Sequence, residues 1–149
     1  MALVVLGSRR ITRGFDFVVP TPAGYRRQVV DVLFDHGLEW ASRLNDTGDV
    51  AATIRNRRVA DSRLRIDAPS AAFFCNPVTR LRVDLLFDFR IAASTLAERA
   101  TRMTIRAHVF EVASAADLLE LKRIARRARS APGDAEDIAF LESIVARGP

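Results

Sequence analysis

The sequence predicts a mixed α/β fold in a single domain spanning residues 1–149. The length is close to the commonest size of one domain and allows a substantial core. Apolar residues alternate with period two in some segments and with helical spacing in others, and the segment 80–89 is the most apolar of the strand-like ones. Because the chain ends in two helical patterns, we expect a mixed sheet flanked by helices, with a C-terminal antiparallel helix pair.

The first half of the chain is expected to be built mainly from strands. Residues 14–19 have the composition of a short strand, and Thr21 with Pro22 is typical of a helix start. That helix is expected to end at Gly37. The further strands predicted in this half are 38–42, 50–54, the segment around Leu64 and Ile66, 71–75 and 81–87, of which the last should lie inside the sheet.

The second half is expected to be mainly helical. Thr95 has the spacing of a helix cap for a short helix at 95–99, and a single strand is predicted within 104–113. Ser114 is expected to cap the first of two longer helices, and Asp134 the second. The linker between these two helices is short, so they should pack as an antiparallel pair.

Composition limits the classes of function that the chain can have. Its formal net charge is +5, but the basic residues are interspersed with acidic ones, which favours a mixed solvated surface over a nucleic-acid interface. Lys122 is the single lysine among 23 basic residues. Its compact ammonium would suit a phosphate oxygen, and the alternative is that its presence is chance in an arginine-rich sequence. The apolar runs are far shorter than the roughly 20 residues of a membrane span, so we expect a cytoplasmic protein without a membrane partner. Cys75 is expected to be a buried apolar residue.

Two acidic residues are notable because of strand geometry. Gly14 and Asp16 should lie on one face of their strand, and Arg82 and Asp84 on one face of theirs. A carboxylate in so apolar a strand as that of Asp84 is unfavourable unless a cation satisfies it. Two interpretations are open: a metal ligand, or an ion pair with Arg82 or Arg13.

These residues resemble the nucleotidyltransferase fold superfamily, and most of all its small bacterial branch related to abortive-infection and toxin-type nucleotidyltransferases. The resemblance covers nearly the whole chain, and the C-terminal block is its most specific part. The segments that carry it are Gly7-Ser8, the run from Arg10 to Val19, the run from Arg82 to Asp88, the block from Asp117 to Ala125, and Asp134-x-x-Asp137.

The resemblance implies a magnesium-dependent transfer of a nucleoside monophosphate from a nucleoside triphosphate. In the family, an Asp-x-Asp pair and a third carboxylate hold two Mg²⁺ ions while a hydroxyl group attacks the α-phosphorus and pyrophosphate leaves. Asp16 matches the second carboxylate of the pair and Asp84 the third, so both are expected metal ligands and, with Lys122, catalytic residues. The expected nucleotide-binding residues are Gly7, Ser8, Arg13, Lys122 and Asp137, of which Asp137 would orient Lys122.

Two departures from the family pattern bear on activity. Gly14 stands where the first carboxylate is expected, and it has no side chain to bind a metal. Residues 1–6 match the end of a helix, so the family's first strand and phosphate turn are expected to be absent, although Gly7-Ser8 could instead be that turn. A missing strand would expose the sheet edge, and we therefore expect a homodimer or a covering N-terminal segment.

Two functional hypotheses follow. In the first, the protein is a divergent nucleotidyltransferase that modifies RNA, a protein or a small hydroxyl acceptor. In the second, it is a catalytically inactive nucleotide- or partner-binding module related to toxin-antitoxin or phage-defence systems. Changing Gly14 to Asp should create or raise Mg²⁺-dependent transfer if the rest of the site is intact.

Overall fold

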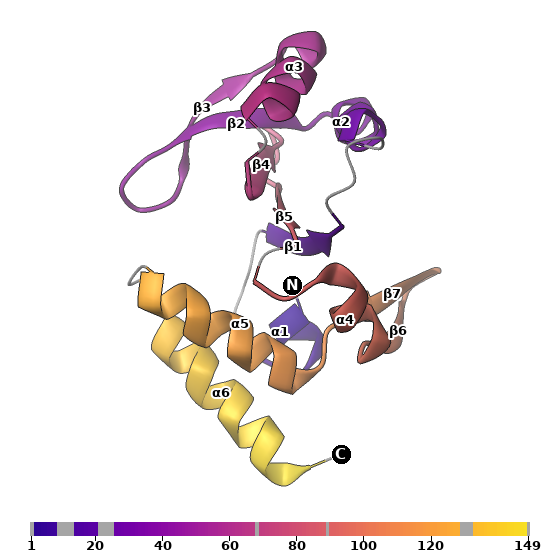
Figure 1. The fold of residues 1–149 in the computed structure, drawn as a ribbon, viewed down its shortest axis with the longest axis vertical. Helices are drawn as coiled ribbons and strands as arrows, with labels where there is room; N and C mark the ends of the chain where they lie inside the picture. The colour runs from indigo at the N-terminus through magenta and orange to yellow at the C-terminus, as the bar shows by residue number, and fades with distance from the viewer. Residues whose placement is uncertain are drawn as a thin grey trace. The chain divides into compact units, whose positions relative to one another are not determined.

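The computed structural model describes residues 2–8, 14–20, 26–67, 69–88, 90–128 and 133–148 (Figure 1). The chain has a mixed α/β fold, as predicted, and it separates into two compact units that are described in turn. The sheet unit contains Thr12–Phe89, and the second unit combines Ala2–Ile11 with Arg90–Pro149. The expectation of one domain stays a prediction. Among the described residues, no helix has the length and apolar character that crossing a bilayer requires.

The sheet unit is a five-stranded mixed sheet with two helices. The strand order is β1-β5-β4-β2-β3, in which β1 and β5 are parallel and the other neighbours antiparallel. The strand β5 has a neighbour on each side, which confirms its predicted place inside the sheet. The elements are β1 (Gly14–Val19), α2 (Arg26–Asp35), β2 (Glu39–Leu44), β3 (Val50–Ile54), α3 (Arg57–Asp67), β4 (Ala71–Cys75) and β5 (Arg82–Phe87).

The strand β1 lies at one edge of this sheet. It pairs with β5 alone among the described strands. The edge strand of a sheet can pair with a strand of another chain. The homodimer expected from it stays a prediction.

The core of the sheet unit lies on one face of the sheet. Alternate residues of β5, Val83, Leu85 and Phe87, are buried there with residues of α2 and α3. The opposite face of β5 carries Arg82, Asp84 and Leu86, which are partly exposed. Because every second residue of this segment is buried, its period-two pattern predicted the strand correctly.

The prediction of a strand around Leu64 and Ile66 is wrong, since these residues lie in α3. The side-chain Oδ1 of Asn56 accepts the backbone N–H of Val59 at 3.2 Å, as a helix cap does. Ala60 and Leu64 are four residues apart and both buried, so the helix has an apolar face. A short alternation of apolar and polar residues also occurs along such a helix, which explains the error.

The second unit consists of helices and a two-stranded hairpin. Its elements are α1 (Ala2–Val5), α4 (Ala93–Glu98), β6 (Thr101–Ile105), β7 (His108–Val112), α5 (Ala115–Ala128) and α6 (Asp134–Arg147). Buried Leu119, Ile138 and Leu141 join the C-terminal helices α5 and α6, which lie side by side in Figure 1.

Two predictions in this unit need correction. The single strand predicted within 104–113 is a hairpin, because the chain turns at Arg106, whose φ is 56°. The short helix α4 is preceded by Ala92, which makes no side-chain cap hydrogen bond, so Thr95 lies inside the helix rather than at its cap. The predicted cap at Ser114 is confirmed, since its Oγ accepts the backbone N–H of Asp117 at 3.1 Å.

Candidate functional site

The two residues expected as metal ligands lie beside each other in the sheet unit. In the parallel pair of β1 and β5, Asp16 is the register partner of Asp84, and Gly14 is the partner of Arg82. Register partners on neighbouring strands project from the same face of a sheet. These four positions therefore form one group on the face of the sheet opposite its core, on the edge strand β1 and its neighbour β5.

The carboxylate of Asp84 is held by Arg82. The Nε atom of Arg82 lies 2.5 Å from Oδ1 of Asp84, and the side chains are 24% and 15% exposed. Of the two interpretations open for Asp84, an ion pair with Arg82 is therefore present in the structure. Arg13 lies outside the described residues.

Two further contacts fix the guanidinium of Arg82. Its Nη1 donates to the backbone carbonyl of Gly48 at 2.6 Å, and its Cζ lies 4.8 Å from the centre of the Phe73 ring. Gly48 belongs to the turn between β2 and β3, which is itself closed by a hydrogen bond from the Gly48 N–H to the Asn45 carbonyl. Arg82 thus connects a strand, a turn and an aromatic ring, and these contacts restrict its movement.

This group of residues does not fit a pair of magnesium ions. Mg²⁺ requires oxygen ligands in near-octahedral geometry, and carboxylates supply most of its protein ligands. Asp16 and Asp84 offer two carboxylates, of which the second already binds a guanidinium, and Gly14 offers none. Within the described parts of the chain, three or more His, Cys, Asp or Glu residues nowhere gather as a metal site would require.

The turn at Gly7 and Ser8 ends helix α1. The N–H of Gly7 donates to the carbonyl of Val4 at 3.0 Å, and the N–H of Ser8 donates to the carbonyl of Leu3 at 2.9 Å. Gly7 has a φ of 96°, the left-handed conformation typical of the residue after a helix. Residues 2–5 are helical, as expected from the resemblance, and both amides expected to bind phosphate already have partners. A phosphate-binding role for this turn stays a prediction.

Lys122 lies between two carboxylates of α6. Its Nζ is 2.8 Å from Oδ2 of Asp137 and 3.3 Å from Oδ1 of Asp134, while the two acidic side chains are only 3% and 7% exposed. The expected contact between Lys122 and Asp137 is therefore present. Its proposed role in phosphate binding stays a prediction, because the ammonium already serves two internal acceptors.

The prediction that Asp134 caps α6 is wrong. The capping position is taken by Gly133, which has a φ of 87° and makes no side-chain cap hydrogen bond. The carboxylate of Asp134 turns to Lys122 instead, and its Oδ2 atom is buried without a hydrogen-bond partner in the part of the chain that the structure describes. A buried carboxylate is stabilised more by an ion pair with a cation than by a hydrogen bond to a backbone N–H at the helix start, which explains why Asp134 contacts Lys122 instead of capping α6.

Sequence reasoning also missed an ion pair between α4 and α5. Asp117 is buried, and its Oδ1 lies 2.5 Å from Nη2 of Arg99. The only signal was the cap spacing of Ser114 and Asp117, which explains why the aspartate is there but not which cation it binds. This pair holds the second unit together and lies outside the predicted site.

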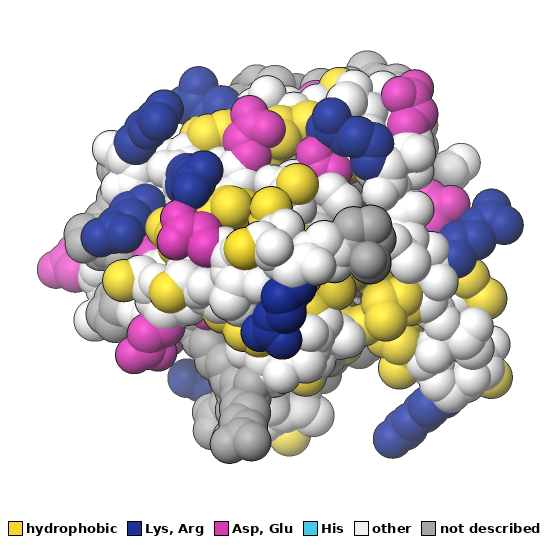
Figure 2. Space-filling view, turned by 90° about the horizontal axis from the view of Figure 1, so that it is seen from below, with side chains coloured by type: hydrophobic (Ala, Val, Ile, Leu, Met, Phe, Trp, Pro, Cys, Tyr) yellow, Lys and Arg dark blue, Asp and Glu magenta, His cyan; other side chains and the backbone are white. Residues whose placement is uncertain are grey.

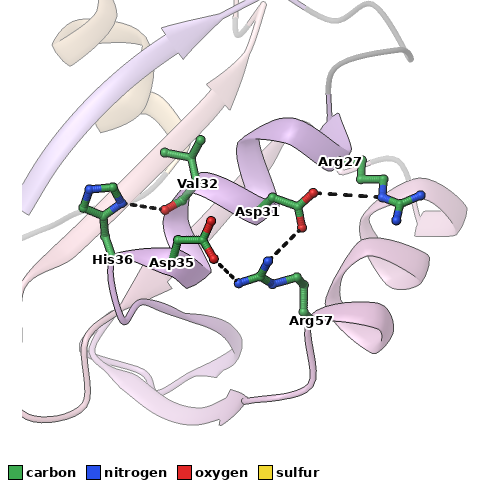
Figure 3. Close-up of polar contacts among 6 residues, drawn as sticks. All are labelled: Arg27, Asp31, Val32, Asp35, His36 and Arg57. Carbon is green, nitrogen blue, oxygen red and sulfur yellow. Dashed lines mark hydrogen bonds and ion pairs between the residues drawn. The ribbon is translucent and has the colours of Figure 1, made fainter.

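A second polar cluster of the sheet unit joins α2 to α3 (Figure 3). Arg57 reaches two carboxylates of α2, with Nη1 3.3 Å from Asp31 and Nη2 2.5 Å from Asp35. The hydrogen bond to Asp35, with the charges of both aspartates, raises the pKa of the Arg57 guanidinium above its usual value. His36 closes the end of α2, with Nδ1 2.8 Å from the carbonyl of Val32. These contacts tie helices together, and nothing in them requires a ligand.

The helix pair α5 and α6 carries two hollows on its surface. A hollow of about 410 Å³ is lined by Ala116, Leu119, Glu120, Arg123, Ile124, Arg127 and Val145. A second, of about 370 Å³, is lined by Arg123, Arg126, Arg127, Ile138 and Glu142. Neither includes Lys122. Figure 2 shows basic and acidic side chains interspersed on the face that it displays, as the sequence predicts.

No model of a known protein family matches the chain, and no curated protein is significantly similar to it.

Proposed function

We propose that the protein is a nucleotidyltransferase-like module that binds a nucleoside triphosphate but does not transfer its nucleoside monophosphate to an acceptor. The observation that carries this proposal is the ion pair of Arg82 with Asp84, beside the side-chain-free position of Gly14. The ion pair occupies the carboxylate of Asp84, one of the expected metal ligands, and the neighbouring position Gly14 has no carboxylate at all. The transfer reaction of the resembled family needs metal ions held by three carboxylates, and this group of residues does not supply them.

Charge and surface chemistry support a triphosphate as the ligand. The chain has a formal net charge of +5, and a positive protein attracts polyanions from solution. Arginine, which makes up nearly all of its basic residues, donates paired hydrogen bonds to phosphate oxygens. The cytoplasmic location expected from the sequence would give the module access to nucleoside triphosphates.

A labelling assay tests the absence of transfer. The full chain is incubated with each α-³²P-labelled nucleoside triphosphate, with Mg²⁺ or Mn²⁺, and with RNA or the protein itself as acceptor. We expect no label on either acceptor. Metal-dependent labelling that is lost in Asp16→Asn and Asp84→Asn, but kept in Asp31→Asn, would overturn the proposal, because Asp31 belongs to the separate cluster on α2.

Equilibrium dialysis against the same nucleotides tests the binding. We expect saturable binding that EDTA does not abolish, since the proposed module does not depend on a metal. If no nucleoside triphosphate binds, the nucleotide part of the proposal is wrong, and the partner-binding version of the inactive module remains as the alternative.

A further inference from the structure

Gly14, which lacks the expected carboxylate, and Arg82 are neighbours in the structure. The parallel register places Gly14 directly beside Arg82, and Asp16 directly beside Asp84. The position at which the metal site lacks a ligand therefore lies next to the residue that already neutralises Asp84. This juxtaposition is not evident in the sequence, where Gly14 and Arg82 are far apart.

The guanidinium of Arg82 is a fixed charge. Arginine stays protonated at all physiological pH values, so the ion pair with Asp84 cannot be released by losing a proton. The Gly48 carbonyl and the Phe73 ring hold the same group from two other elements, at 2.6 Å and 4.8 Å. A metal ion that approached Asp84 would meet a positive charge anchored at three points.

The backbone at Gly14 has room for a side chain on this face. A Cβ atom added there would lie 3.7 Å from the carbonyl oxygen of Arg82 and 3.9 Å from its Cβ, which are ordinary contacts. An aspartate at this position would therefore fit, and its carboxylate would be introduced beside Arg82. Opposite charges at that separation attract, so the new carboxylate would pair with the guanidinium.

We infer that Arg82 is the permanent counter-cation of Asp84 in the place of a metal ion, and that a divalent metal site can form only when both Gly14 and Arg82 are changed. This inference rests on the proposed function, which treats these residues as a metal site that has lost its ligands. It differs from the expectation that Gly14→Asp alone would create or raise Mg²⁺-dependent transfer, which stays a prediction.

Manganese binding tests the inference directly. The free Mn²⁺ signal in electron paramagnetic resonance is titrated with four full-length proteins: the natural one, Gly14→Asp, Arg82→Leu, and the double variant. We expect the double variant to bind Mn²⁺ at least about tenfold more tightly than either single variant, because it alone has three carboxylates without the guanidinium. Equal binding by Gly14→Asp and the double variant would overturn the inference, as would a double variant that binds no better than the single ones.

A matched control separates a site from a simple change of charge. The pair Arg102→Leu and Thr104→Asp, on the exposed strand β6, makes the same charge change, with the arginine and the new aspartate close together on one strand. It should leave Mn²⁺ binding at the level of the natural protein. If Arg82→Leu does not fold, judged by circular dichroism and Trp40 fluorescence, Arg82→Gln replaces it in both proteins, because glutamine can still donate to the Gly48 carbonyl.

The outcomes also separate this inference from the proposed function. Nucleotide transfer by the natural protein would contradict the proposed function whatever the variants bind. Manganese binding by the double variant would support the role of Arg82 even if the natural protein binds no nucleotide.

Discussion

Arg82 in the sheet unit and Lys122 in the second unit each neutralise acidic residues of the predicted site, but in different surroundings. Arg82 holds one carboxylate, that of Asp84, which is 15% exposed, and shares its charge with a carbonyl and a ring. Lys122 serves two carboxylates that are almost completely buried. The charges of Arg82 and Asp84 cancel, and both side chains are partly exposed to water. The cluster of Lys122 has one positive and two negative charges, and its carboxylates are buried. Burial of the acid should therefore decide how much each cation stabilises the fold.

The largest effect is expected from Lys122→Met. It removes the ammonium that contacts two buried carboxylates of α6, and breaking a buried pair costs about 3–5 kcal/mol. Urea unfolding followed by far-ultraviolet circular dichroism measures the loss. Arg123→Met is the matched control on the same helix, since its pair with Glu142 is 53% and 49% exposed, and it should cost less than about 1 kcal/mol. Similar losses for the two variants would contradict the importance of burial.

A smaller effect is expected from Arg82→Leu. It leaves Asp84 without its guanidinium, but water can reach this carboxylate, so we expect a loss of about 1–2 kcal/mol. Fluorescence of Trp40, which packs against the core of the same unit, follows the unfolding in urea. Adding Asp84→Asn to this variant should restore part of the stability, because a neutral amide needs no counter-charge. No recovery would mean that the loss comes from the contacts of Arg82 with Gly48 and Phe73.

The smallest effect is expected from Arg57→Met, which removes the exposed contacts between α2 and α3. The raised pKa of Arg57 means that its contribution is complete below the usual arginine pKa and is lost only as the pH rises through the raised value. The difference in urea midpoint between this variant and the natural protein should therefore be small and constant from about pH 6 to about pH 9. A difference that shrinks within this range would show that another group controls the cluster.

The sequence predicted most of the sheet because period-two patterns coincide with one buried face. It failed at α3, where the cap at Asn56 and the buried pair of Ala60 and Leu64 outweigh a short alternation. It also failed at residues 101–112, where a turn at Arg106 divides one apolar segment into two strands. Local patterns do not show where a chain reverses when no glycine or proline marks the turn.

The candidate site could be predicted in part. Strand geometry placed Arg82 and Asp84 on one face, and the resemblance placed Asp137 near Lys122; both contacts are present. The hydrogen bond from Arg82 to Gly48 could not be predicted, because it depends on how a distant turn folds against the sheet. The partner of Asp134 was missed for another reason: an acid at the start of a helix suits a cap and an ion pair equally well from sequence alone.

The single cysteine offers a built-in probe of this sheet. Cys75 is buried, and it is the register partner of Arg82 on β5 and of Glu39 on β2. A thiol reagent can reach it only when the strands around it separate, so its labelling rate measures the frequency of local opening. No label needs to be engineered into the protein, and the rate in each Arg82 variant would show whether the guanidinium keeps these strands closed.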